Sequence, residues 1–318
     1  MTATVAWAVV GPVLGRSLDF DQLFFLAGSI DDVFPACSVT NGIVTAPDPG
    51  NDCNIQPAVQ TVTVYKMALC VAKPSAPTVL AAASLTGCST IFESTSATGS
   101  PVDIDPNVVA SLPNGTVTKP ANGTYNYLYV ELDPEVKIKA SVRFASAIGD
   151  SNGFTTGAYC WSTGATTYNF SNNLSGSMPQ ATACGSSAPG AGSVSATSSL
   201  YNSAFNDVLY PPGTGFVYSF VNLPTTAGGL KTMDAYLINA DGKIPNTQTV
   251  NTMGDVKRVS GILTLPAPGM TVSDATTKIV LGYNNSKGAQ IATQAGPLST
   301  RRLTKFGNGP FDMTVTAQ

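Results

Sequence analysis

Residues 59–72 read VQTVTVYKMALCVA, and this stretch predicts the fold class of the chain. Apolar Val62 and Val64 alternate with Thr61 and Thr63, which places the two kinds of side chain on opposite faces of an extended strand. Alternation of this kind in a run of Val, Thr and Tyr is typical of β-structure. We therefore predict a β-strand here, with one buried face.

Further strands are predicted on the same grounds. The segment TYNYLYVELDPEVKIKASVRF (124–144) has the pattern of a hairpin with Asp133 and Pro134 in its turn. Two segments, 16–28 and 103–115, carry helix-capping patterns and are predicted to form one or two short helices. The remaining predicted strands lie in the C-terminal third, at 215–223, 231–244, 255–265, 277–284, 299–306 and 311–318.

Pro and Gly recur between these strands at the spacing typical of a β-sandwich. The predicted fold class is therefore all-β, mainly antiparallel and sandwich-like, with disulfide-stapled loops. We divide the chain into an N-terminal strand (1–16), a β-domain (17–205) and a C-terminal β-region (206–318). Residues 145–205 of the second part form a long stapled loop, and the third part can belong to the same sandwich.

The composition excludes several classes of function. Charged residues make up only 11% of the 318 residues, and the net charge is −3, so the basic surface expected of a nucleic-acid-binding protein is missing. No apolar run reaches the roughly 18 to 20 residues that a membrane-spanning helix needs. A polar surface built from Ser, Thr, Asn and Gly is instead typical of extracellular β-proteins.

The cysteines point to an oxidising compartment. Each successive couple brackets a stretch rich in Pro, Gly, Ser or Asn, so sequence order predicts three disulfides. Closing loops of this size stabilises a fold by about 3 kcal/mol each on the chain-entropy model. The alternative of free, buried thiols in an intracellular protein stays open. The predicted pairs are Cys37 with Cys53, Cys70 with Cys88, and Cys160 with Cys184.

The chain contains no histidine, so it cannot assemble a Ser-His-Asp or Cys-His arrangement. The GDSNG segment at 149–153 resembles the nucleophile block of GDS-type esterases and lipases, but that family also needs a downstream histidine. Ser151 is therefore interpreted as a turn residue. Glu131, Asp133 and Glu135 could act as a glycosidase-like carboxylate group, but a solvated hairpin end explains them as well. We predict that the protein is not an enzyme and needs no cofactor.

Two kinds of surface modification or ligand remain open. Asp103, Asp105 and Asn107 have the opening spacing of a calcium-binding loop, although the later positions of that motif are absent. A helix cap at Asp105 is the simpler interpretation. Glycans are possible at five N-x-S/T sequons, at Asn114, Asn122, Asn169, Asn173 and Asn284.

The N-terminal segment raises the question of assembly. Residues 1–14 read MTATVAWAVVGPVL, in which Val5, Trp7 and Val9 fall on one strand face. Such a strand can pair within its own chain or complete a sheet of another copy. Acidic Asp19 and Asp21 lie near one end of the sequence and basic Arg301, Arg302 and Lys305 near the other, a distribution that favours head-to-tail contact.

These observations predict a structural subunit of an extracellular filament, pilus-like, or of a surface layer. Copies would join head to tail by β-strand addition and form a homo-polymer at the cell surface. Two alternatives remain: a virion coat or tail protein, and a secreted carbohydrate-binding module or adhesin. In the adhesin the tyrosines at 125, 127 and 129, or Trp161, would stack on sugar rings.

Overall fold

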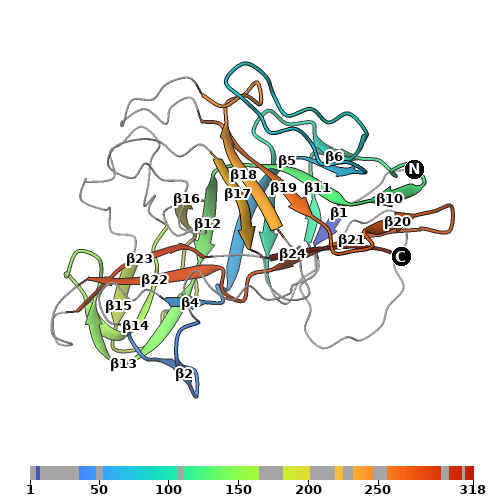
Figure 1. The fold of residues 1–318 in the computed structure, drawn as a ribbon. Helices are drawn as coiled ribbons and strands as arrows, with labels where there is room; N and C mark the ends of the chain where they lie inside the picture. Colours follow the sequence, from blue (N-terminus) through green and yellow to red (C-terminus); the bar gives the residue numbers. More distant parts are fainter. Residues whose placement is uncertain are drawn as a thin grey trace.

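The computed structural model describes residues 5–7, 36–47, 53–105, 110–164, 182–200, 219–224, 232–245, 256–294, 301–309 and 312–318. Within these ranges every regular element is a β-strand, and most strand pairs are antiparallel (Figure 1). The predicted all-β, mainly antiparallel fold class is therefore confirmed.

The largest sheet has ten strands, with β5 at its centre. The strand pairs place β11 and β12 along one edge of β5, and β6 and β7 along the other. Beyond them, β19, β18 and β17 follow β11, β16 follows β12 and β9 follows β6. The strands are β5 (Val59–Cys70), β6 (Cys88–Ser94), β7 (Ser100–Ile104), β9 (Gly115–Val117), β11 (Tyr127–Leu132), β12 (Glu135–Lys139), β16 (Thr197–Leu200), β17 (Ser219–Pro224), β18 (Thr232–Ile238) and β19 (Arg258–Thr264).

A second sheet has eight strands and lies at the lower left of Figure 1. Its main path is β15-β14-β13-β23-β22-β4, and β3 pairs with both β2 and β13. The strands are β2 (Val39–Thr40), β3 (Ile43–Val44), β4 (Cys53–Ile55), β13 (Ser141–Gly149), β14 (Thr156–Ser162), β15 (Thr182–Gly185), β22 (Ala289–Gln294) and β23 (Arg302–Asn308).

Three further sheets have two strands each. They pair β1 (Val5–Trp7) with β8 (Ala110–Leu112), β10 (Gly123–Tyr125) with β20 (Met270–Val272), and β21 (Ile279–Asn284) with β24 (Asp312–Ala317).

One hydrophobic core joins the two large sheets. Val64 of β5, Phe144 of β13 and Phe306 of β23 belong to the same buried cluster, and each is at most 1% exposed. This packing of sheet against sheet is sandwich-like. Both large sheets also combine strands from before and after residue 205, since β11 pairs with β19 and β13 with β23.

Strand β5 changes its environment halfway along its length. Up to Val64 its residues alternate between buried and half-buried, as predicted, whereas all residues from Met67 to Cys70 are buried. Met67 and Leu69 join the main core, while Ala68 and Cys70 join a second apolar cluster. The second half of β5 is therefore covered on both faces.

The predicted hairpin at 124–144 is wrong. Strands β11 and β12 do not pair with each other but follow one another along β5, so that Leu132 lies opposite Val64 and Lys137 opposite Thr61. The Asp133 N–H donates to the carbonyl of Thr63, at 2.8 Å, which keeps the chain on β5. Pro134 has no N–H for the ladder. The Asp-Pro pair therefore interrupts one long strand rather than turning the chain back.

The expected short helices are not found in the described residues. In the segment 103–115, Ala110–Leu112 forms strand β8, because these residues pair with β1. The other expected helix, at 16–28, lies outside the described residues.

Candidate functional site

The N-terminal strand pairs with its own chain. Val5 lies opposite Leu112, Ala6 opposite Ser111, and Trp7 opposite Ala110. This pair is a sheet of its own and is only three residues long. Val9, the third residue of the predicted apolar face, lies outside the described residues.

The predicted charge complementarity is only partly visible. Asp19 and Asp21 lie outside the described residues. Arg301 is 7% exposed, and its Nη1 atom donates to the carbonyls of Ala46 at 3.2 Å and Pro47 at 3.0 Å. Arg301 is therefore buried and is not the surface charge that the sequence suggested. The two carbonyls supply the hydrogen-bond acceptors that a buried guanidinium needs.

The other two basic residues lie on β23. Arg302 is exposed, and its side chain lies next to the backbone of Gly153. Lys305 lies opposite Ala292 of β22.

Three disulfides join the cysteine pairs that sequence order predicts. Two of them link residues directly opposite one another on paired strands, Cys70 with Cys88 and Cys160 with Cys184. Disulfides persist in oxidising compartments, as in secreted and extracellular proteins. The fold therefore carries the covalent signature of a protein from such an environment.

The loop at 71–87, closed by Cys70–Cys88, folds back onto the ten-stranded sheet. Ala83 and Leu85 pack on the second apolar cluster, which explains the double burial of β5. Lys73 forms an ion pair with Asp234 of β18, with 2.6 Å between Nζ and Oδ2. This hydrogen bond raises the pKa of Lys73, so its ammonium group keeps its charge at neutral pH.

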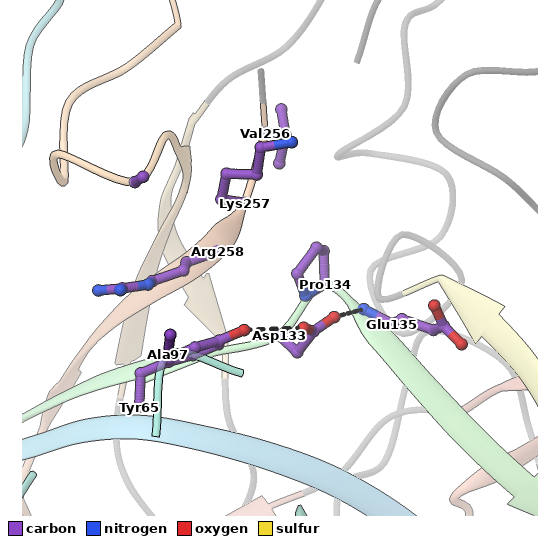
Figure 2. Close-up of a pocket in the computed structure, with 9 residues that line it drawn as sticks. Tyr65, Ala97, Asp133, Pro134, Glu135, Val256, Lys257 and Arg258 are labelled. Carbon is purple, nitrogen blue, oxygen red and sulfur yellow. Dashed lines mark hydrogen bonds between the residues drawn. The ribbon is translucent and has the colours of Figure 1, made fainter. Parts of the chain in front are cut away.

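A pocket of about 410 Å³ lies where the strand next to β5 is interrupted. It is lined by residues of β5, of the Asp133–Pro134 break and of the start of β19 (Figure 2). The Tyr65 hydroxyl donates to Asp133 Oδ2 at 3.1 Å, and the Glu135 N–H donates to Asp133 Oδ1 at 2.8 Å. Tyr65 is an extra residue in the pairing of β5 with β11, which turns its side chain toward the break.

Arg258 closes one side of this pocket. Its guanidinium lies 4.4 Å from the centre of the Tyr65 ring, a cation–π distance. Its Nη1 atom also lies 2.7 Å from Glu131 Oε2, while the Tyr129 hydroxyl donates to Glu131 Oε1 at 2.8 Å. Glu131 is therefore a buried carboxylate with two partners, Tyr129 on its own strand β11 and Arg258 on the neighbouring strand β19.

Burial governs the ionisation of these groups. It raises the pKa of Tyr65 to about 12, with a further contribution from the Asp133 charge. Burial also raises the pKa of Asp133, although hydrogen bonds from the Glu135 backbone and from Tyr65 act in the opposite direction. The pKa of Tyr129 is raised by burial and by the Glu131 charge. Both tyrosines thus stay protonated donors at physiological pH.

Two of the three carboxylates of the hydrolase alternative have structural partners. Glu131 is held by Arg258 and Tyr129, and both oxygens of Asp133 accept hydrogen bonds. Glu135 lines the pocket. The contacts of Glu131 and Asp133 fix the geometry of the strand break.

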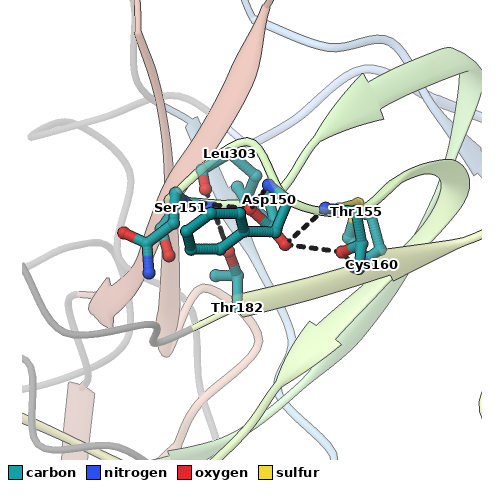
Figure 3. Close-up of a disulfide and its surroundings, with 9 residues drawn as sticks. Asp150, Ser151, Thr155, Cys160, Thr182 and Leu303 are labelled. Carbon is teal, nitrogen blue, oxygen red and sulfur yellow. Dashed lines mark hydrogen bonds between the residues drawn. A yellow bond between two sulfur atoms is a disulfide. The ribbon is translucent and has the colours of Figure 1, made fainter.

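The GDSNG segment forms a tight turn built around Asp150 (Figure 3). Asp150 is fully buried, and its carboxylate accepts hydrogen bonds from the backbone N–H groups of Asn152, Phe154 and Thr155. The Thr155 hydroxyl adds a fourth, at 2.6 Å. Burial opposes ionisation of Asp150, but these hydrogen bonds outweigh it and lower the pKa.

Ser151 is a turn residue, as the sequence interpretation holds. Its N–H donates to the Thr182 hydroxyl at 2.9 Å, and that hydroxyl donates to the Leu303 carbonyl at 3.0 Å. These bonds tie the turn to β15 and β23, and Cys160–Cys184 lies beside it (Figure 3).

The tyrosines do not form an exposed stacking surface. Tyr125 and Tyr129 are each 3% exposed and belong to different apolar clusters. Tyr127 is half-buried against the second cluster, and Trp161 is half-buried next to Gly185. The three tyrosines therefore do not form the single exposed face that the sequence suggested, because β10 and β11 direct Tyr125 and Tyr129 into two different clusters.

The possible calcium ligands are only partly within the described residues. The Asp103 carboxylate accepts a hydrogen bond from the Thr61 hydroxyl at 2.6 Å, and Asn107 lies outside the described residues. In the part of the chain that the structure describes, no three acidic, Cys or His residues group as a metal site would require.

Two sequon asparagines are exposed in the structure. Asn114 lies in a turn with a φ of 53°, and Asn122 donates to Asp274 Oδ1 at 2.7 Å.

Sequence reasoning missed the interactions that shape the pocket and those that hold the loop at 71–87 on the sheet. Arg258 and Asp234 carry no motif, and their partners lie on strands distant in sequence, so pattern alone gives no signal for them. The DP pair at 133–134 was a usable signal for a strand break, since Pro cannot donate to a ladder.

No helix among the described residues combines the length and apolar character needed to cross a membrane. No family model, curated protein or solved structure matches the chain.

Proposed function

We propose that the protein is a structural subunit of an extracellular filament or surface layer, and that copies of the chain join head to tail. In this proposal the N-terminal strand of one copy pairs with β8 of the next copy, in the register that β1 has with β8 in the single chain. The partner of the protein is then another copy of itself.

The β1–β8 pair is the observation that carries this proposal. It is a separate sheet of three residue pairs, so its exchange between copies breaks no other strand pair of β1 or β8. The net contribution of each backbone hydrogen bond to stability is only about 1 kcal/mol. Exchange of an identical element between copies is a low-cost route to assembly.

The chain is long enough for this exchange. Residues 8–35 separate β1 from Ala36, and 28 extended residues span at most roughly 90 Å. A strand on such a connection can reach β8 of a neighbouring copy. Each copy carries one donor strand and one acceptor strand, so in this proposal donation runs in one direction from copy to copy. Such a heterologous contact forms a filament where the rotation does not close into a ring.

Composition and covalent structure agree with this role. Three disulfides and a surface of low charge suit a protein that persists outside the cell. The proposal assigns no catalysis to the chain. The chain has no histidine, and the carboxylates of Glu131 and Asp133 are engaged with other residues of the fold.

Electron microscopy of purified protein tests the proposal. We expect the intact chain to polymerise and a chain lacking residues 1–10 to stay monomeric. The point variant Ala6→Pro should act like the deletion, because Pro removes an N–H and fits poorly in a paired strand. Thr2→Pro, outside the three paired residues, is the matched control and should polymerise. Filaments of normal length from the truncated chain would exclude donation by the N-terminus.

A further inference from the structure

Strand β14 carries two aromatic side chains that do not belong to the core. Tyr159 and Trp161 are half-buried, whereas Cys160 and Ser162 are completely buried. Because side chains alternate along a strand, the two rings lie on the face of the eight-stranded sheet that is turned away from the core. Among the described residues, neither ring packs on either of the two apolar clusters. Core packing therefore does not explain them.

The neighbouring strands carry small residues beside these rings. On β15, Gly185 lies opposite Tyr159, and Ala183 lies opposite Trp161. A side chain at Gly185 would meet the indole of Trp161, with only 3.3 Å between its Cβ atom and Cη2 of the ring. The indole therefore occupies the space above this glycine. On the other side, Ser141 of β13 lies opposite Trp161. The residues paired with Trp161 are thus small on both neighbouring strands.

Arg143 is the only charged residue of strands β13, β14 and β15. It lies opposite Tyr159, and its guanidinium is 5.4 Å from the centre of the Tyr159 ring, a cation–π distance. Arg143 is exposed, and no carboxylate in the described part of the chain pairs with it. A guanidinium that stacks on a ring keeps its fork of N–H donors available for an acceptor. This face of the sheet therefore presents an uncompensated positive charge beside two rings.

These side chains stand on a rigid base. The disulfide Cys160–Cys184 joins β14 to β15 at residues directly opposite one another, and β13 pairs with β14 on its other side. A ligand that binds here meets a surface already in place, which lowers the ordering cost of binding. We call Arg143, Tyr159 and Trp161 the aromatic platform.

We propose that the aromatic platform binds an acidic saccharide, a sugar chain whose rings carry carboxylate groups. The flat C–H face of one sugar ring would lie on the indole of Trp161. A ring carboxylate would accept charge-assisted hydrogen bonds from the guanidinium of Arg143. The Tyr159 hydroxyl can both donate to and accept from sugar hydroxyls. Side chains two residues apart on a strand lie about 7 Å apart, so a short oligosaccharide can contact both rings.

The charge of the platform selects this class of ligand. Two rings alone would suit an uncharged apolar partner, but the unpaired cation of Arg143 is complementary to an anion. A nucleic acid also combines rings with negative charge, but its binding requires several cations along the phosphate backbone. The three strands supply one cation, and the net charge of the chain is −3. A sugar ring with a single carboxylate matches one guanidinium.

This inference goes beyond the proposed assembly and does not rest on it. Figure 1 places β13, β14 and β15 at the lower left and β1 at the right, so the platform and the N-terminal strand lie in different parts of the molecule. A chain lacking residues 1–10 should therefore bind the saccharide with unchanged affinity. In a filament, repeated platforms would bind one long acidic polysaccharide at several points and hold it more tightly than a single copy does.

Calorimetry with two matched probes tests the role of charge. The probes are trigalacturonate and its fully methyl-esterified form, which keeps the sugar rings and removes the charges. The intact chain should bind trigalacturonate saturably and about tenfold more tightly than the ester. Arg143→Gln should abolish this difference between the two probes. Lys139→Gln removes an exposed positive charge on β12 of the other large sheet, so it is the control and should retain the difference.

Trp161 gives a second measurement. Trp161→Ala should weaken the binding of both probes by about tenfold, as expected for the loss of an aromatic contact. A thermal melt checks that this variant folds. The chain has two tryptophans, so Trp7→Phe leaves Trp161 as the only one. The fluorescence of that chain should change during titration with trigalacturonate, which reports contact at the platform without removing it.

The outcomes decide between the ligand classes. The same titrations with oligomers of glucuronate and mannuronate cover other uronic acids. If none of the three acidic oligomers binds at millimolar concentration, or if decaproline binds in their place through Trp161, the saccharide assignment is overturned. Equal binding of trigalacturonate and its ester would overturn the role of Arg143. Specific saccharide binding by a chain that forms no filaments would support this inference and overturn only the proposed assembly.

Discussion

Asp150 shows how one buried charge holds a surface turn in place. Its carboxylate holds the turn that presents Phe154, and four hydrogen bonds from three residues compensate for its burial. Because its pKa is lowered on folding, the charged form stabilises the native state at all pH values above the ordinary carboxyl range. This contribution is lost as pH falls through the lowered pKa.

We therefore expect Asp150→Asn to lower the free energy of unfolding at pH 6 by about 2 to 4 kcal/mol, since bonds to a charged group are lost in the interior. The difference from the wild type should shrink in acid, as the native carboxylate itself becomes protonated. Urea unfolding at a series of pH values measures this. Ser151→Ala, one residue away, is the control and should change stability little. A deficit for Asp150→Asn that persists unchanged at pH 2 would contradict the account.

Arg258 and Glu131 form the second residue-scale test. Arg258→Met leaves the Glu131 carboxylate buried without its cation, which should cost about 3 kcal/mol. Adding Glu131→Gln removes the charge and should recover part of this loss. Denaturant titration of the two variants checks the order, and a double variant less stable than Arg258→Met alone would be inconsistent with a buried ion pair.

At the scale of elements, β5 explains how much the sequence could predict. The alternation of apolar and polar residues at 59–64 could be recognised in the sequence because only one face of this part of β5 packs on the core. The strands of the C-terminal third could be predicted for the same reason. The cysteine couples were predictable because each closes a local loop. The route of the chain after Leu132 was not, since a DP pair is compatible with a hairpin turn or an interrupted strand. Only pairing with β5, distant in sequence, decides between them.

The candidate site was less predictable than the fold. A tyrosine face at 125, 127 and 129 was expected from spacing, but Asn126 separates β10 from β11 and the rings enter two different clusters. The sequence pattern also gives no indication that Leu80 is exposed. Its exposure depends on a turn at Thr78 and on the docking of the loop against β18.

Removing one disulfide tests the role of the stapled loop. Cys70→Ala with Cys88→Ala should lower the free energy of unfolding by about 3 kcal/mol and make the segment 71–87 susceptible to proteolysis. The same substitution of Cys37 and Cys53 is the control, and it should leave the segment 71–87 resistant. Limited proteolysis with mass spectrometry locates the cleavage. Equal resistance of the loop in both variants would mean that the hydrogen bonds alone hold it.

At the scale of the whole molecule, the fold is a covalently braced β-sandwich with a short strand at its N-terminus. Bracing by three disulfides and a continuous core makes the body rigid, while the β1–β8 pair is small and separate. A rigid body with an exchangeable strand is what head-to-tail polymerisation needs.

The most direct test of strand donation is exchange of single cysteines across the β1–β8 register. Ala6→Cys and Ser111→Cys are placed on separate chains, which are mixed, allowed to assemble and oxidised; residues directly opposite in an antiparallel pair are close enough for a disulfide. If copies donate their N-terminal strands, the Ala6→Cys chain becomes covalently joined to the Ser111→Cys chain. If the mixture yields no such product, while one chain carrying both substitutions closes its own disulfide and stays monomeric, strand donation between copies is contradicted.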